Sequence, residues 1–152
     1  EQIEAAVLDV ARFDVFKLSE AVLSGAVPRL LRMLDGLEAE GEAAVLVHWT
    51  LAEDARALAR VRAALDAGKP LPLALREARV WGAKERLIER IAPRLDAAQA
   101  GALVQAAQVC DGLVKGLRHP DWPSDPWAAL RRLALMLAEA ASGKAGVVLT
   151  AR

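Results

Sequence analysis

The sequence has one cysteine, two histidines and no excess charge of either sign. A single cysteine, Cys110, can form neither an internal disulfide nor a CxxC pair for a metal ion, and with no signal peptide in the chain it favours a reducing cytoplasm. With a formal net charge of zero, the chain lacks the excess of basic residues found in proteins that bind nucleic acid by themselves through many phosphate contacts. Any nucleic-acid contact is therefore expected to be local or shared with partners.

Other absences narrow the function further. No apolar run approaches the roughly 18 residues that span a membrane. No GxxxxGK[ST] loop occurs, and the SGKAG stretch near the end follows a helical pattern, which excludes a phosphate-binding loop of the ATPase type. His48 falls in an apolar helix, His119 in a loop and Cys110 on an apolar stripe, so nothing brings a nucleophile and a base together. We expect no catalytic, cofactor or metal site.

One weak enzyme candidate remains. Asp111, Lys115 and His119 follow each other at steps of four residues, and they share one helical face if the helix continues that far. Such rows arise by accident on helix surfaces, so the row gives little support for acid-base chemistry.

What the chain does contain is typical of a globular helical protein. Its 152 residues are 55% hydrophobic and 26% charged, enough for one proper core. Because its first residue is glutamate and not methionine, we expect the chain to be a piece of a longer protein. The fold class predicted is all-α, a compact bundle of about five to six helices. Helical periodicity, caps and Gly or Pro breaks place helical segments at 14–25, 28–41, 42–65, 71–78, 79–95, 96–117 and 125–141.

The four tryptophans divide into core residues and one exception. Trp49, beside His48, is expected to be packed in the core, as are Trp81 and the helix-periodic Trp127. Trp122 lies in a loop rich in proline and charge, with no obvious core to fill.

Two further features are ambiguous. The basic run at 76–94 is diluted by glutamates and is expected to be mostly a solvated helix face, with a subunit or phosphate contact as the alternative. Gly112, inside a predicted helix, is a candidate point of close approach by another backbone.

The order of motifs gives a family resemblance. RFDVFKLSEAVLSG at 12–25, RLLRMLDGLEAEGEAAVLVHWTLA at 29–52, RVW at 79–81, D..VKG at 111–116 and DPWAALRRLALML at 125–137 together resemble the C-terminal part of the delta-subunit family of bacterial DNA polymerase III. The resemblance covers nearly the whole chain and is weakest in the C-terminal tail.

The resemblance implies a clamp-loader collar domain, an all-helical unit that packs against like domains and holds the loader in a ring. It implies three parts: residues 1–9 as the end of a preceding AAA+-like lid or linker, 10–142 as the collar domain and 143–152 as a tail. The partners implied are the tau/gamma and delta prime subunits through the collar, and primer-template DNA in the assembled loader. The sliding clamp would be contacted only through an N-terminal region absent here. The parent assembly is a nucleotidyltransferase holoenzyme of the cytoplasmic, nucleoid-associated replisome, with no membrane contact.

The resemblance also points to a DNA contact. The loop before the last helix would carry an aromatic residue near the primer-template junction, here Trp122 where some relatives have tyrosine. A ring stacked on a base contributes about 1 to 3 kcal/mol without reading sequence. Lys115, Arg118 and His119 are near enough in sequence to offer phosphate contacts. Packing of Trp122 beneath the loop is an equally good alternative.

The last predicted helix has an apolar arc wider than one-sided burial requires, which implies a second packing surface such as a partner subunit. The interface residues predicted there are Leu130, Arg131, Arg132, Leu135 and Met136. A stand-alone helical module that binds a peptide or RNA remains the competing hypothesis.

Overall fold

A computed structural model describes residues 15–143, so the expectations for residues 1–9 and for most of the tail lie outside the described part. Residues 15–23 are helical. The helices that follow are α2 (Val27–Ala39), α3 (Ala44–Asp66), α4 (Leu71–Glu77), α5 (Ala83–Ile91), the short 3-10 helix η1 (Ala92–Arg94), α6 (Ala97–Val114) and α7 (Pro126–Ala141). The prediction of an all-α fold is confirmed, because residues 15–143 contain no strand. They form seven α-helices, where a bundle of about five to six was expected.

Capping side chains begin the last two helices, as predicted. The Asp96 carboxylate accepts from the backbone N–H of Gln99 at 2.7 Å, and the Gln99 side chain accepts from the Asp96 N–H at 2.9 Å, a reciprocal capping box. Asp125 accepts from the Ala128 N–H at 2.9 Å, and Pro126 follows it in the first turn. These local bonds fix where the two helices around the Trp122 loop start.

Two predicted boundaries are wrong. The segment expected from 79 becomes helical only at Ala83, because Arg79 and Gly82 have φ of 59° and 74°, in the left-handed region that ends one helix before the next begins. The helix expected to reach 117 stops at Val114. Gly112 is not a helix crossing point either, because a Cβ there would meet the side chain of Leu117, 3.4 Å away in the same connection.

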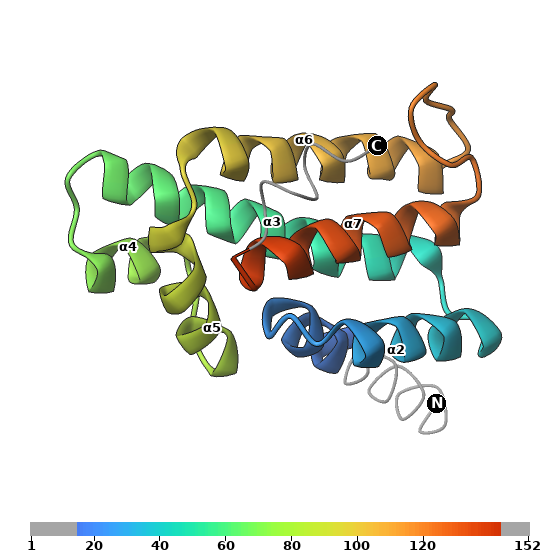
Figure 1. Ribbon diagram of the computed structural model, residues 1–152, viewed down its shortest axis with the longest axis horizontal. Coiled ribbons are helices and arrows are strands. Elements are labelled where there is room, and N and C mark those ends of the chain that lie inside the picture. Colours follow the sequence, from blue (N-terminus) through green and yellow to red (C-terminus); the bar gives the residue numbers. More distant parts are fainter. Residues whose placement is uncertain (1–14, 144–152) are drawn as a thin grey trace, which may run out of the picture.

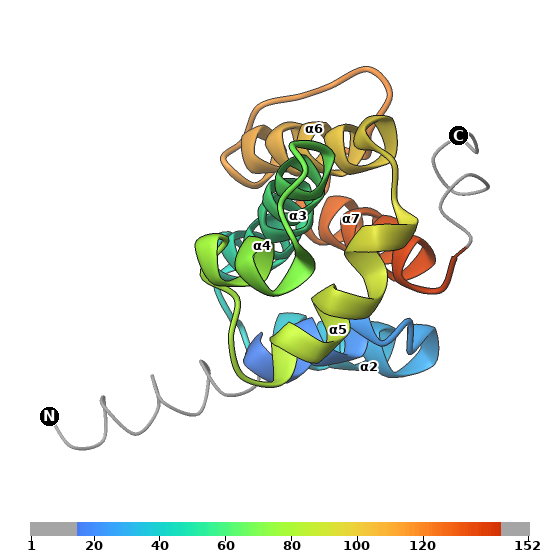
Figure 2. The same cartoon turned by 90° about the vertical axis from the view of Figure 1, so that its left-hand side faces the viewer.

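The long helices lie lengthwise in one bundle, with α4 and α5 at one end (Figure 1). Helix α3 contacts α6 and α7, and α7 also contacts α2. Seen along the bundle, α5 crosses obliquely below α3 and α4 (Figure 2). The fold therefore centres on α3, with the last helix closing it.

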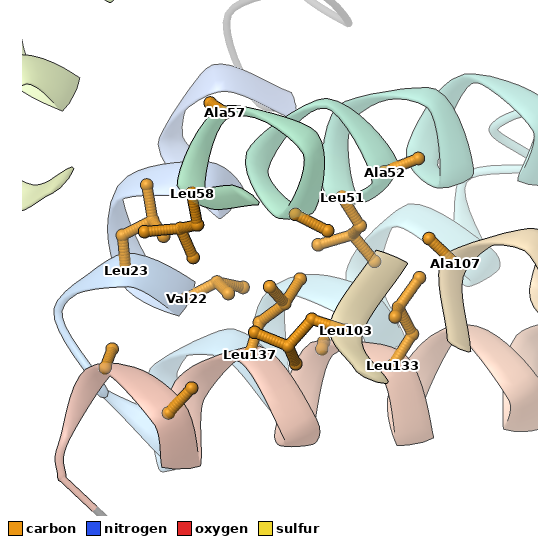
Figure 3. Packing of buried hydrophobic residues seen from close by; sticks show 14 of the residues in the cluster. Val22, Leu23, Leu51, Ala52, Ala57, Leu58, Leu103, Ala107, Leu133 and Leu137 are labelled. Atoms are coloured by element: carbon orange, nitrogen blue, oxygen red, sulfur yellow. The ribbon is translucent and has the colours of Figure 1, made fainter. Parts of the chain in front are cut away.

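Fully buried leucines hold these helices together. Leu51 and Leu58 of α3, Leu103 of α6, and Leu133 and Leu137 of α7 are all at 0% exposure, and their side chains converge in one cluster (Figure 3). Each such side chain contributes about 1.5 to 3 kcal/mol on burial.

Cys110 also belongs to this core, as its place on an apolar stripe predicted. Burial, together with the neighbouring charge of Asp111, raises the pKa of its thiol to about 12. The thiol is therefore protonated at neutral pH and unsuited to nucleophilic chemistry.

Polar contacts join helices that are distant in sequence. Arg131 of α7 donates to Asp35 and Glu38 of α2 at 2.6 and 2.7 Å. The first turn packs against the end of α7, since a Cβ built on Gly25 (φ 72°) would lie 3.4 Å from the Ser142 side chain. The two ends of the described chain are thus joined.

One arginine satisfies the carbonyls at the end of α5 and η1. Nη1 of Arg62, in α3, lies 3.3, 3.2 and 3.1 Å from the carbonyl oxygens of Ala92, Pro93 and Leu95. Helix ends leave carbonyls without intrahelical partners, so this guanidinium replaces the missing donors.

Candidate functional site

The loop between α6 and α7 holds Trp122 against the domain. The ring is partly buried and packs on the hydrophobic core. The Arg132 guanidinium of α7 lies over the ring, with Cζ 4.2 Å from the centroid, and Nη1 donates to the Asp121 carbonyl at 2.6 Å. The expectation that Trp122 has no core to fill is therefore wrong, and the packing alternative describes its surroundings.

The basic residues predicted beside Trp122 lie in or at the start of the same loop. The Lys115 ammonium is 3.0 Å from Asp111, and Arg118 is exposed with no ion-pair partner among residues 15–143. His119 Nδ1 accepts from the Asp121 N–H at 3.1 Å. Two cations and a histidine ring thus share one loop with Trp122, although Lys115 is already paired.

The proposed acid-base row does not form. Because α6 ends at Val114, His119 lies beyond the helix and does not share a face with Asp111 and Lys115. The last two form an exposed i,i+4 ion pair of the common surface type. The four-residue spacing would place the three side chains on one face only if the helix continued to His119, and α6 ends before that residue.

His48 is a satisfied core histidine, as predicted. It is 7% exposed, and its Nε2 donates to the Ala107 carbonyl at 2.8 Å, which fixes the tautomer at that nitrogen. Its Nδ1 lies 3.7 Å from Asp111. The ring therefore links α3 to α6.

Trp49 contradicts its prediction: it is 54% exposed and not packed in the core. With Val45, which is 51% exposed, it lines a groove of about 360 Å³ between α3 and α6. Val104 of α6 forms part of the opposite wall. Trp49, Val45 and Val104 thus give this groove an apolar part that residues 15–143 leave exposed.

Trp81 was also expected in the core, yet it is 69% exposed. The left-handed turn at Arg79 and Gly82 buries Val80 instead, at 6% exposure, and turns the tryptophan outward. A second groove of about 340 Å³ lies there, lined also by Phe16, itself 47% exposed. The core assignment failed because the chain is not helical at this point.

Lys84, in the basic run, has a buried acidic partner that sequence reasoning missed. Asp54 of α3 is fully buried, accepts from the Ser19 hydroxyl at 2.7 Å and lies 2.7 Å from the Lys84 ammonium of α5. The ammonium is close enough for an ion pair, although its angle departs from that of a good hydrogen bond. Burial raises the pKa of the Asp54 carboxyl, and Lys84 and Ser19 offset part of that rise. Asp54 follows Leu51 by three residues and precedes Leu58 by four, a core spacing that could have revealed it.

The predicted interface on α7 is only partly available. Leu130 is fully buried within the domain, so its side chain is not open to a partner in this structure. Leu135 and Met136 are partly exposed and pack on the core. Arg131 pairs with acids of α2, and Arg132 covers Trp122. Among residues 15–143, the large apolar side chains that are exposed lie elsewhere: Phe16, Val45, Trp49, Trp81 and Leu117.

Within residues 15–143 no three His, Cys, Asp or Glu side chains are grouped to hold a metal ion. No helix of this described part has the length and apolar character to cross a membrane.

The chain is similar to DNA polymerase III subunit delta of Escherichia coli (strain K12), with 30% identity over 136 residues. The similarity covers 90% of this chain and 38% of that protein. It confirms the resemblance that the order of motifs predicted. No family model matches the chain. No solved structure matches it significantly.

Proposed function

We propose that the chain is the collar domain of a clamp-loader delta subunit, which helps to hold the loader together while the sliding clamp is placed on DNA. The similarity to subunit delta over 90% of the chain carries this proposal. The fold supports it, because a compact helical bundle with uncovered apolar grooves suits a domain that packs against neighbours.

On this proposal the neighbours are the tau/gamma and delta prime subunits, and the sliding clamp is bound by another region of the subunit. The polymerase chemistry belongs to other subunits of the holoenzyme, and the place of action is the cytoplasmic replisome at the nucleoid. A loader assembled through this domain should form without nucleotide, because the contact is made by helix surfaces.

We place the assembly surface on the groove between α3 and α6, together with the partly exposed Leu135 and Met136. Trp49 is its largest exposed side chain, and tryptophan is enriched among residues that dominate binding energy. Leu130 and Arg131 are excluded as main contacts because they are used inside the domain.

Trp49→Ser is expected to lower the affinity for the other loader subunits by at least tenfold, or about 1.4 kcal/mol, because it removes a large apolar contact. Stability of the variant should stay within about 0.5 kcal/mol, because surface substitutions cost little. Size-exclusion chromatography and titration calorimetry measure the two effects.

Trp81→Ser is the matched control, since it removes an equally large ring from the other groove. Loss of assembly with Trp81→Ser and not with Trp49→Ser would move the surface to the second groove. A wild-type chain that fails to bind loader subunits, when full-length delta does bind, would contradict the collar proposal. Binding of a peptide or RNA would then favour the competing module.

We further propose a primer-template contact at the Trp122 loop, with Lys115, Arg118 and His119 nearby. Trp122→Ala in the assembled loader is expected to weaken primer-template binding about fivefold, or about 1 kcal/mol, the lower end of the stacking range because the ring is partly buried. Subunit assembly should be unchanged. Fluorescence anisotropy with labelled primer-template DNA measures the affinity.

Trp81→Ala serves as the comparison in the same assay. Its ring is 69% exposed and lies near the exposed Arg79 in sequence, so it also combines the aromatic and cationic groups on which a base can stack. Reduced affinity in Trp81→Ala alone would place the stacking ring there, and an unchanged affinity in Trp122→Ala would leave Trp122 a structural residue.

A further inference from the structure

Arg132 makes two contacts with the Trp122 loop from a single side chain. Its guanidinium covers one face of the indole ring, with Cζ 4.2 Å from the centroid, and its Nη1 donates to the Asp121 carbonyl at 2.6 Å. A cation is attracted more strongly to the face of a tryptophan ring than to the face of a tyrosine or phenylalanine ring. A hydrogen bond from a charged donor is also shorter and stronger than one from a neutral donor. Ring and adjoining backbone are thus fixed to α7 together.

The other hydrogen bonds at the tip of this loop are local. The Trp122 N–H donates to the His119 carbonyl at 3.2 Å, and the Asp121 N–H donates to the His119 ring at 3.1 Å. These bonds shape the loop but do not attach it to a helix. Arg132 supplies that attachment, 11 positions along the chain from Asp121.

Two adjacent arginines on α7 therefore have separate tasks. Arg131 pairs with Asp35 and Glu38 of α2, whereas Arg132 has its contacts in the loop. This pair offers a natural comparison, since both carry the same charge on the same helix.

We propose that Arg132 is the positioning residue of the Trp122 loop: it covers one face of the ring and holds the ring in place before DNA arrives. The inference rests on the proposed primer-template contact and reassigns Arg132 from a subunit interface to that contact. A ring ordered in advance loses less conformational freedom on binding, so Arg132 increases affinity without touching DNA.

The first test follows the ring in the chain labelled with 5-fluorotryptophan, with its ¹⁹F resonance assigned through Trp122→Phe. Arg132→Ala should shift the Trp122 resonance and speed hydrogen exchange at the Asp121 and Trp122 amides at least tenfold. Arg131→Ala should leave both unchanged. Arg132→Lys, which keeps the charge but loses the planar guanidinium, should restore little. An unchanged resonance and exchange rate in Arg132→Ala would overturn the inference.

The second test uses the assembled loader and primer-template DNA. Arg132→Ala should lower affinity by the same factor as Trp122→Ala, and the double variant should lose no more. The slope of affinity against salt should stay as in wild type, because a positioning residue releases no counterion. A slope reduced by about one, as for a lost phosphate contact, or additive losses in the double variant, would overturn the inference.

The two proposals can fail separately. If Trp122→Ala leaves DNA affinity unchanged, the primer-template contact is contradicted, while the fluorine and exchange data still decide whether Arg132 positions the loop.

Discussion

Lys84→Met is expected to destabilise the domain by about 3 kcal/mol at pH 7, because it leaves the Asp54 carboxyl buried without its ion-pair partner. This is the lower end of the range for breaking a buried pair, since the Lys84 side chain is 28% exposed. The contact joins α3 to α5, whose Ile88 and Ile91 are also buried in the core. Urea unfolding followed by circular dichroism measures the loss.

The loss should depend on pH in a defined direction. Burial holds the pKa of Asp54 in the folded protein above its ordinary value of 3.8. At a pH between 3.8 and this raised pKa, the folded protein therefore binds more protons than the unfolded one. The contribution of Asp54 to stability is therefore fully present below pH 3.8 and is lost as pH rises through the raised pKa. Without Lys84 the pKa rises further, so the variant loses more than wild type at neutral pH. On acidification the difference should shrink, because Asp54 becomes protonated in both folded proteins.

Arg86→Met is the matched control on the same helix, because Arg86 is exposed and has no ion pair within the described residues. Its effect should stay within about 0.5 kcal/mol at either pH. Equal losses for the two variants, or a Lys84→Met loss that grows on acidification, would contradict the buried ion pair.

The second large effect is expected in the core. Leu133→Ala should cost about 3 kcal/mol, within the range of roughly 2 to 5 for a buried leucine, because the side chain is fully enclosed where α7 meets α3 and α6. The urea midpoint should fall while the m-value stays constant.

Leu135→Ala is the comparison, two residues further along α7. Its side chain is partly exposed, so its stability loss should be about 1 kcal/mol or less. If Leu135 also lies in the assembly surface, the variant should bind loader subunits more weakly despite its stability. A loss of stability equal to that of Leu133→Ala would show that Leu135 belongs to the core alone.

Periodicity and caps predicted the bundle well, because those signals depend on neighbours a few residues apart. The apolar stripe of α6 and its capping box are local patterns, and both are present. The helical stretches failed only at their ends, at Val114 and before Ala83, where the chain takes up left-handed or irregular turns.

The candidate sites were predicted less well, because exposure is set by distant elements. Trp49 and Trp81 are of a residue type common in cores, but no other helix within residues 15–143 covers them. Trp122 was singled out because its loop offered no obvious core, yet the ring packs on the core, and its partner Arg132 comes from the next helix and was assigned elsewhere. The spacing of Asp54 from Leu51 and Leu58 marks it as a core position, but its partner Lys84 is 30 positions away, and no short-range pattern can reveal that pairing.

The closing role of α7 has a consequence for biosynthesis. This helix is the last described element to leave the ribosome, yet it contributes to the core with α2, α3 and α6, and its end packs against the turn at Gly25. Arg131 reaches back 96 positions to Asp35. Until residue 141 has emerged, the hydrophobic surfaces of the earlier helices stay open to water. The nascent domain therefore needs shielding until α7 has emerged, and a chain cut before α7 should aggregate.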